Sequence, residues 1–200
     1  MAAINKNVSD KPDLPVIPFV SQQVWEQWLE QNHAISKGIW LQMFKKSSGI
    51  ASVNYAEALD VALCYGWIDG QLKSIDELSY MQRFTPRRPR SIWSKRNIEH
   101  IARLTNEGRM KPAGIKEAEA AKSDGRWEVA YDGQGTMSLP SDFQEVLLKN
   151  EKALAFYESL NKANKYAIAW RIQTAKRSET REKRIKEILE MLGREEKFHM

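Results

Sequence analysis

Six basic residues and no acidic residue lie between positions 83 and 96, the stretch whose composition points most directly to binding chemistry. The chain as a whole has 31 Lys and Arg against 26 Asp and Glu, so its net positive charge is concentrated here. Such a local excess favours an anionic partner. Pro86 and Pro89 exclude regular structure and hold the arginines on an extended path. The bases are Arg83, Arg87, Arg88, Arg90, Lys95 and Arg96.

Aromatic residues interleave with these bases, a mixture that can stack on nucleobases and hold phosphates. A second interpretation is a pocket in which two or three guanidinium groups grip a phosphate or carboxylate. A third is a solvated loop whose arginines pair with acidic helices of the same protein. The sequence leaves these three open. The candidate ligand-binding or anion-binding residues are Trp67, Asp69, Arg83, Arg87, Arg88, Trp93, Lys95 and Arg96.

Asp69 is the candidate for catalysis, because burial beside tryptophans could raise its pKa and make it a general base. The favoured alternative is structural, since an aspartate next to a glycine often closes a turn by bonding backbone amides. The three histidines show no metal-ligand spacing, and the chain has no P-loop or dinucleotide-binding motif. We therefore expect no metal, no cofactor and, on balance, no enzyme activity.

The elements that must position these residues begin with an amphipathic helix after Asn54. Asn54 and Glu57 form a plausible capping box, and Gly66 can end the helix in a left-handed conformation. Residues 68–75 and 78–84 then read as a β-hairpin. The inward helix positions are Tyr55, Ala58, Leu59, Ala62 and Leu63.

The rest of the chain predicts an α+β fold with a small, mostly antiparallel sheet, flanking helices and a C-terminal helical region. Strands are expected at 39–44 and 50–53, and helices begin after Ser21 and Ser94. We predict a flexible arm at 1–18, an α+β core domain at 19–132 and a linker at 133–139. Helices packed on the core would follow at 140–193, and a tail at 194–200.

Composition limits the cellular setting. The single cysteine, Cys64, excludes an internal disulfide, and its place late in a helix suggests a small core residue. No apolar run is long enough to span a membrane, and the N-terminal residues lack a signal-peptide core. We expect a cytoplasmic location, while the oligomeric state stays open.

Several motifs in fixed order resemble the YdeI/OmpD-associated (bacteriocin-protection) family of bacteria, over about residues 19–193. They are Gly38-Ile39-Trp40-Leu41, Cys64-Tyr65-Gly66-Trp67-Ile68-Asp69-Gly70, Gln82-Arg83-Phe84-Thr85-Pro86-Arg87-Arg88-Pro89, Trp93-Ser94-Lys95, Gly108-Arg109-Met110, Ala175-Lys176 and Thr180-Arg181. The resemblance implies a role in stress response and antimicrobial peptide resistance, and supplies no catalytic residues. Some members are described as acting in the envelope, whereas this sequence shows no export signal.

Together these observations predict a non-enzymatic stress-protection or interaction protein with an Arg-rich anion-binding surface. Its partner would be an anionic ligand or another protein. The alternatives are a protein that binds nucleic acid or a phosphate ligand and, less favoured, a small enzyme that uses Asp69.

Overall fold

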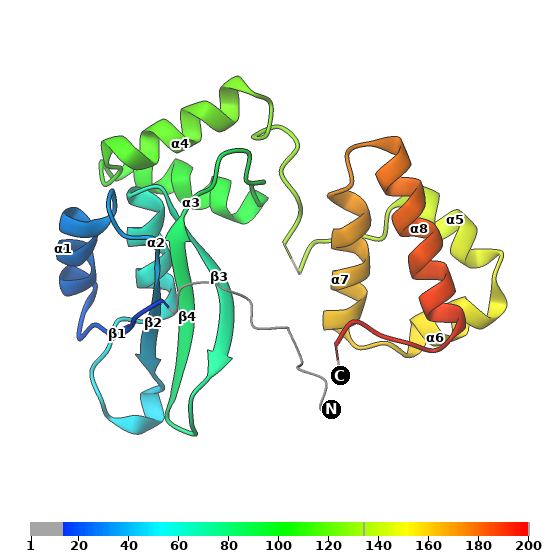
Figure 1. Cartoon of the computed structure of the whole chain (residues 1–200), viewed down its shortest axis with the longest axis horizontal. Coiled ribbons are helices and arrows are strands. Elements are labelled where there is room, and N and C mark those ends of the chain that lie inside the picture. Colours follow the sequence, from blue (N-terminus) through cyan, green and yellow to red (C-terminus); the bar gives the residue numbers. More distant parts are fainter. Residues whose placement is uncertain (1–13, 134, 200) are drawn as a thin grey trace, which may run out of the picture. The chain divides into compact units, whose positions relative to one another are not determined.

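The computed structural model describes residues 14–133 and 135–199, and in this part of the chain it has one sheet and a series of α-helices (Figure 1). The chain divides into two units. The first consists of the described residues up to Ser91 together with His100–Ser123, and the second of Ile92–Glu99 and the described residues from Asp124 onward. Each unit is described separately below.

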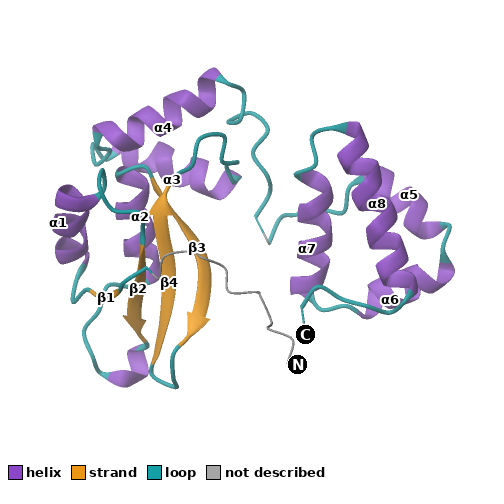
Figure 2. Cartoon of the chain, viewed as in Figure 1, coloured by secondary structure: helices purple, strands orange, loops and turns teal. Residues whose placement is uncertain are grey.

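The first unit contains a four-stranded sheet, drawn in orange in Figure 2. Its strands are β1 (Val16–Pro18), β2 (Ile39–Phe44), β3 (Trp67–Ser74) and β4 (Ser79–Pro86), in the spatial order β1-β2-β4-β3. The β2–β4 and β3–β4 pairs are antiparallel, while β1 runs parallel to β2. The predicted α+β class with a mostly antiparallel sheet is therefore confirmed, although the sheet is mixed.

Helices α1 (Gln22–Asn32) and α2 (Tyr55–Cys64) pack on one face of this sheet, which we call the helix-covered face. On it, the paired residues Ile39 and Phe84 are fully buried, and the ring of Trp25 on α1 lies 5.9 Å from that of Phe84. The indole Nε1 of Trp25 donates to the carbonyl of Ala58 on α2. The two helices and the sheet thus share one apolar core.

The start and end of α2 follow the sequence signals. The Asn54 side chain accepts from the Glu57 amide, and the Glu57 carboxylate accepts from the Asn54 amide, which completes the predicted capping box. Gly66 has a φ of +74°, in the left-handed region that favours glycine. Cys64 is buried, as expected for a core residue.

Two predictions for the first unit are wrong. Residues 50–53 form no strand, because β2 already pairs with β1 and β4, and Val53 makes a single backbone bond to Phe19. The flexible arm predicted at 1–18 is also wrong for its last three residues, because Val16–Pro18 form strand β1. Residues 1–13 of that arm lie outside the described part of the chain.

Helices α3 (Lys95–Asn106) and α4 (Pro112–Ser123) follow the sheet, and a short 3-10 helix, η1 (Lys46–Ser48), follows β2. Ser94 caps α3 as predicted, since its hydroxyl accepts from the Asn97 amide at 3.1 Å. Helix α4 meets α2 at Gly114, where an added Cβ would lie 2.3 Å from the carbonyl oxygen of Cys64. Only a residue without a side chain fits this contact.

The second unit has a core of its own. Its later helices are α5 (Ser141–Leu148), α6 (Glu151–Ser159), α7 (Lys162–Gln173) and α8 (Ser178–Gly193), close to the predicted helices. Side chains from all four helices or their ends gather in one buried cluster. Its members are Phe143, Leu147, Ala153, Leu160, Ile168, Ile172, Ile188 and Leu192.

Candidate functional site

The arginines of the basic stretch differ in burial. Arg87 is buried, its amide donates to the Gly66 carbonyl at 3.0 Å, and its Nη1 donates to the Ser91 hydroxyl at 3.4 Å. Arg88 and Arg90 are exposed in the loop that follows β4, and Arg90 has a φ of +64°. Arg87 therefore helps to hold the loop, while the next arginines face solvent.

Arg83 lies on β4, on the second face of the sheet, opposite the helix-covered face. It pairs with Trp40 on β2, and Met81 on the same face pairs with Lys73 on β3. The Lys73 Nζ stands 4.5 Å from the centre of a Trp40 ring. Two cations and an indole are thus neighbours on this face. We call Trp40, Lys73 and Arg83 the Trp40 cluster.

The charge of Arg83, Arg88 and Arg90 is not neutralised by a carboxylate within the described residues. None of the ion pairs found there includes these three side chains, and the buried Nε of Arg83 has no hydrogen-bond partner there. Elsewhere in the chain, Arg103 binds Asp60, Arg126 binds Asp124 and Arg181 binds Asp142, with N–O distances of 2.6–2.8 Å. Arg83, Arg88 and Arg90 therefore differ from these three.

Three further predicted site residues belong to the second unit. Trp93 is buried against Trp127, with ring centres 5.1 Å apart. The Lys95 Nζ forms an ion pair with Asp132 at 2.6 Å, and this bond, with one from Gln173, lowers the pKa of Asp132. Arg96 is exposed on α3. The predicted set is thus divided between the two units.

Trp67, another predicted site residue, is a core side chain. It is 1% exposed, its rings lie near those of Trp25 and Trp28, and its Nε1 donates to the His33 carbonyl at 3.1 Å. A partner on the surface cannot reach it. Its role is to join α1 to β3.

Asp69 lies on the helix-covered face, because it pairs with Phe84, so it is separated by the sheet from Arg83. Its Oδ2 accepts a 2.9 Å hydrogen bond from the Tyr55 hydroxyl, a side-chain partner in place of the backbone amides that the sequence suggested. Asp69 and Tyr55 line a pocket of about 560 Å³. The other lining residues are Lys45, Gly70, Leu72, Ser74, Tyr80 and Gln82.

The sequence reasoning missed a charged network between α2 and α3. The Asp60 carboxylate accepts from Arg103 Nη2 at 2.6 and 2.7 Å and lies 2.7 Å from His100 Nδ1. Although burial opposes its charge, the bonds from Arg103 and His100 lower the pKa of Asp60. No spacing rule connects residues 40 positions apart on two helices, so only the packing of the helices reveals this network.

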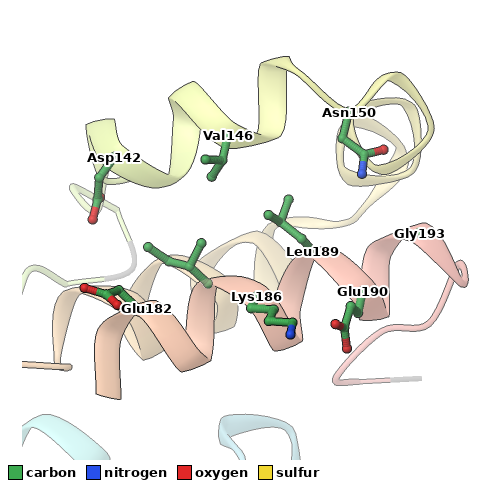
Figure 3. A pocket seen from close by; sticks show the side chains of 9 residues that line it. Asp142, Val146, Asn150, Glu182, Lys186, Leu189, Glu190 and Gly193 are labelled. Carbon is green, nitrogen blue, oxygen red and sulfur yellow. The ribbon is translucent and has the colours of Figure 1, made fainter. Parts of the chain in front are cut away.

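A groove in the second unit lies between α5 and α8, with a volume of about 550 Å³ (Figure 3). Val146, Ile185 and Leu189 provide its apolar side chains. Charged side chains lie along its edges, and Figure 3 shows Glu182, Lys186 and Glu190 on α8 opposite Asp142 on α5. The Asp142 carboxylate is held by Arg181, whose bond lowers its pKa.

No helix in the described ranges combines the length and apolarity that crossing a bilayer requires. Residues 14–133 and 135–199 also bring no three His, Cys, Asp or Glu side chains together in the way that a metal site needs.

Comparison with known proteins gives two family matches. Residues 17–117 match a family model described as "Domain of unknown function (DUF8412)", and residues 136–195 match one described as "Bacteriocin-protection, YdeI or OmpD-Associated". The second match confirms the resemblance found in the sequence, but it covers residues 136–195, whereas the resemblance was expected over about residues 19–193. The quoted motifs between residues 38 and 110 lie outside it, and those at 175–181 lie inside it.

One curated protein with a detectable match is the tRNA 5-methylaminomethyl-2-thiouridine biosynthesis bifunctional protein MnmC of Campylobacter concisus. It is 36% identical over 64 residues, which cover 30% of this chain and 10% of that protein. The match thus spans about a tenth of the relative's length. No solved structure matches the chain significantly. Since the first family model covers about half of its residues, the chain belongs to the family described as Domain of unknown function (DUF8412), and its C-terminal part carries the bacteriocin-protection, YdeI or OmpD-associated region.

Proposed function

We propose that this chain is a non-enzymatic stress-protection protein that works by binding, and that Arg83, Arg88 and Arg90 with Lys73 bind an anionic partner. The observation that carries the proposal is the lack of a carboxylate partner for the three arginines in the described part of the chain, where Arg103, Arg126 and Arg181 have one. A guanidinium group that is not paired within the protein can bind a phosphate or carboxylate with two hydrogen bonds.

The Trp40 cluster supports a nucleic acid or a phosphate ligand as the anion. Lys73 and Arg83 supply charge beside an indole, and flat aromatic groups with neighbouring cations suit the bases and phosphates of a single strand. Trp40 is only 9% exposed, so stacking would need some movement of its neighbours. Phosphate contact by the cations needs no such movement.

The test is the salt dependence of binding to a fluorescently labelled single-stranded oligonucleotide, with inorganic polyphosphate as competitor. Four phosphate contacts predict a log–log salt slope of about −2.8. Arg88→Ala with Arg90→Ala should bring the slope to about −1.4. The matched control is Lys152→Ala with Lys183→Ala, since both lysines are exposed in the second unit and stand near Glu195 and Glu187.

The control should bind like the wild type. Equal binding by the Arg88/Arg90 variant and the wild type would overturn the proposal, as would equal weakening by the control. If polyphosphate competes as strongly as unlabelled oligonucleotide, the protein binds phosphate groups and does not require nucleobases.

The groove between α5 and α8 favours a second candidate function, which is protection through contact with a bacteriocin. All nine residues that line it lie within the part that matches the bacteriocin-protection family. Bacteria expressing the chain with Leu189→Gln in the groove should then survive a bacteriocin less well than bacteria expressing wild type. Leu148→Gln is the control, because Leu148 is on α5, is 60% exposed and does not line the groove. Equal survival of all three strains would remove this candidate.

A further inference from the structure

The lining of the pocket beside Asp69 includes none of Arg83, Arg88 and Arg90, and we propose that this pocket binds a small organic amine in its protonated form. The Asp69 carboxylate would receive the ammonium group, and the apolar body of the ligand would lie against Tyr80 and Leu72. The cavity of about 560 Å³ is within the usual range for small-molecule sites. The sheet separates it from Arg83, so the two sites can be tested separately.

Asp69 has acceptor capacity to spare. An ionised carboxylate offers about four lone-pair positions on two oxygens. Only one hydrogen bond to it is found among the described residues, from the Tyr55 hydroxyl to Oδ2. This bond holds the Asp69 carboxylate against Tyr55 in the first turn of α2. The other carboxylate oxygen, Oδ1, can then accept a hydrogen bond from a ligand. A charged donor would form a short, strong bond there.

The backbone beside Asp69 is held in place by a buried side chain. Gln82 is 3% exposed, lines the same pocket and donates from Nε2 to the Gly70 carbonyl at 2.7 Å. Pairing of β3 with β4 shifts register between Asp69 and Leu72, so this bond secures an irregular part of the strand. The position of the Asp69 carboxylate is therefore set before a ligand arrives.

The remaining walls also favour a cation with an apolar body. Tyr55 and Tyr80 present aromatic rings, whose faces attract cations, and Leu72 is 58% exposed. Among the described lining residues Lys45 is the one base, and its Nζ donates to the Glu77 carbonyl at 2.8 Å. The positive charge of Lys45 makes an anionic ligand the competing possibility, so the experiment must distinguish an amine from an anion.

Phenethylamine is a suitable probe, with phenethyl alcohol as its neutral analogue and phenylacetate as its anionic one. Each is titrated into the isotope-labelled full chain to about 10 mM while backbone amide signals are followed by NMR, because a single charged contact gives affinities in the millimolar range. We expect saturable shifts at Asp69, Gly70 and Gln82 with the amine. The alcohol should bind about 10-fold more weakly.

Asp69→Asn is the decisive variant, because the amide oxygen can still accept from Tyr55 while the charge is lost. It should weaken amine binding about 10-fold, and Glu119→Gln, at an exposed position on α4, should not change it. Equal binding of the amine by both variants would overturn the proposal. So would preference for phenylacetate, which would assign the pocket to Lys45, or absence of saturable shifts with the wild type. Thermal melting of each variant shows whether it is folded.

Discussion

The Tyr55 hydroxyl donates a 2.9 Å hydrogen bond to Oδ2 of Asp69, which ties the first turn of α2 to strand β3. Tyr55→Phe removes the donor and leaves the carboxylate with one bond fewer, so we expect the free energy of unfolding to fall by about 1–2 kcal/mol. Tyr80→Phe is the control, since no hydrogen bond of its hydroxyl is found among the described residues. Chemical denaturation that shows equal losses for both variants would contradict this assignment.

Leu63 tests the core of the first unit. It is 1% exposed on the buried stripe of α2, so Leu63→Ala should lower the free energy of unfolding by about 2–5 kcal/mol through lost burial and a residual cavity. Ile35→Ala, at a side chain that is 78% exposed, should change it by less than about 0.5 kcal/mol. Urea unfolding of both variants measures the difference, and a loss well below about 1 kcal/mol for Leu63→Ala would show that the stripe is not in the core.

Gly114 tests the contact between α2 and α4. In Gly114→Ala the new methyl group would meet the carbonyl oxygens of Cys64 and Leu63 at 2.3 and 2.7 Å, so the helices must move apart. We expect a loss of about 1–3 kcal/mol in the free energy of unfolding. At Gly193, the last residue of α8, an added Cβ meets nothing within 4 Å. Gly193→Ala should therefore stabilise the chain by up to about 1 kcal/mol, and thermal melts of the two variants should shift in opposite directions.

Much of this fold follows from local signals in the sequence. The capping box at Asn54 and Glu57 gave the start of α2, and the strand expected at 39–44 is β2. Strand β1 could not be found in this way, because three residues beside prolines have no periodicity and pair only through the tertiary fold. Residues 50–53 show the reverse error, because they were expected to form a strand, whereas both sides of the preceding strand, β2, are already paired with β1 and β4.

The site was less predictable than the fold, because the face on which a strand residue lies depends on register. Asp69 and Arg83 lie on the paired strands β3 and β4 of the hairpin. Asp69 pairs with Phe84, the residue after Arg83, so the two side chains lie on opposite faces of the sheet. Burial likewise distinguishes two neighbouring arginines, since Arg87 is buried and Arg88 is exposed. Charge composition found the basic stretch, but only the tertiary structure distinguishes an arginine that holds a loop from one that faces solvent.

Arg87 and Arg88 therefore give opposite predictions. Arg87 is 7% exposed and bonded to the loop, so Arg87→Ala should lower the free energy of unfolding by about 1–3 kcal/mol. Arg88→Ala removes an exposed side chain and should change it by less than about 0.5 kcal/mol, while weakening the binding of a single-stranded oligonucleotide. Denaturation and anisotropy on the same samples separate the two effects. If Arg88→Ala destabilises the chain as much as Arg87→Ala, Arg88 is a structural residue and not part of a binding surface.

The network around Asp60 predicts how stability depends on pH. Burial raises the pKa of this carboxyl, but the hydrogen bonds from Arg103 and His100 outweigh it and bring the pKa below its ordinary value of 3.8. The unfolded chain therefore takes up the Asp60 proton at a higher pH than the folded chain does. The stabilisation is complete above the unfolded pKa and is lost as the pH falls through the folded one.

Asp60→Asn should accordingly lower the free energy of unfolding by about 1–3 kcal/mol at pH 7, where the carboxylate is charged in both states. The difference from wild type should shrink as the pH falls below about 4, because the wild type then loses the same charge. Arg103→Gln removes the guanidinium group that lowers the folded pKa of Asp60, so the stability lost on acidification should be smaller than in the wild type. Urea unfolding between about pH 2.5 and pH 7 measures all three curves. A difference between wild type and Asp60→Asn that stays constant over this range would mean that the Asp60 charge does not stabilise the contact between α2 and α3.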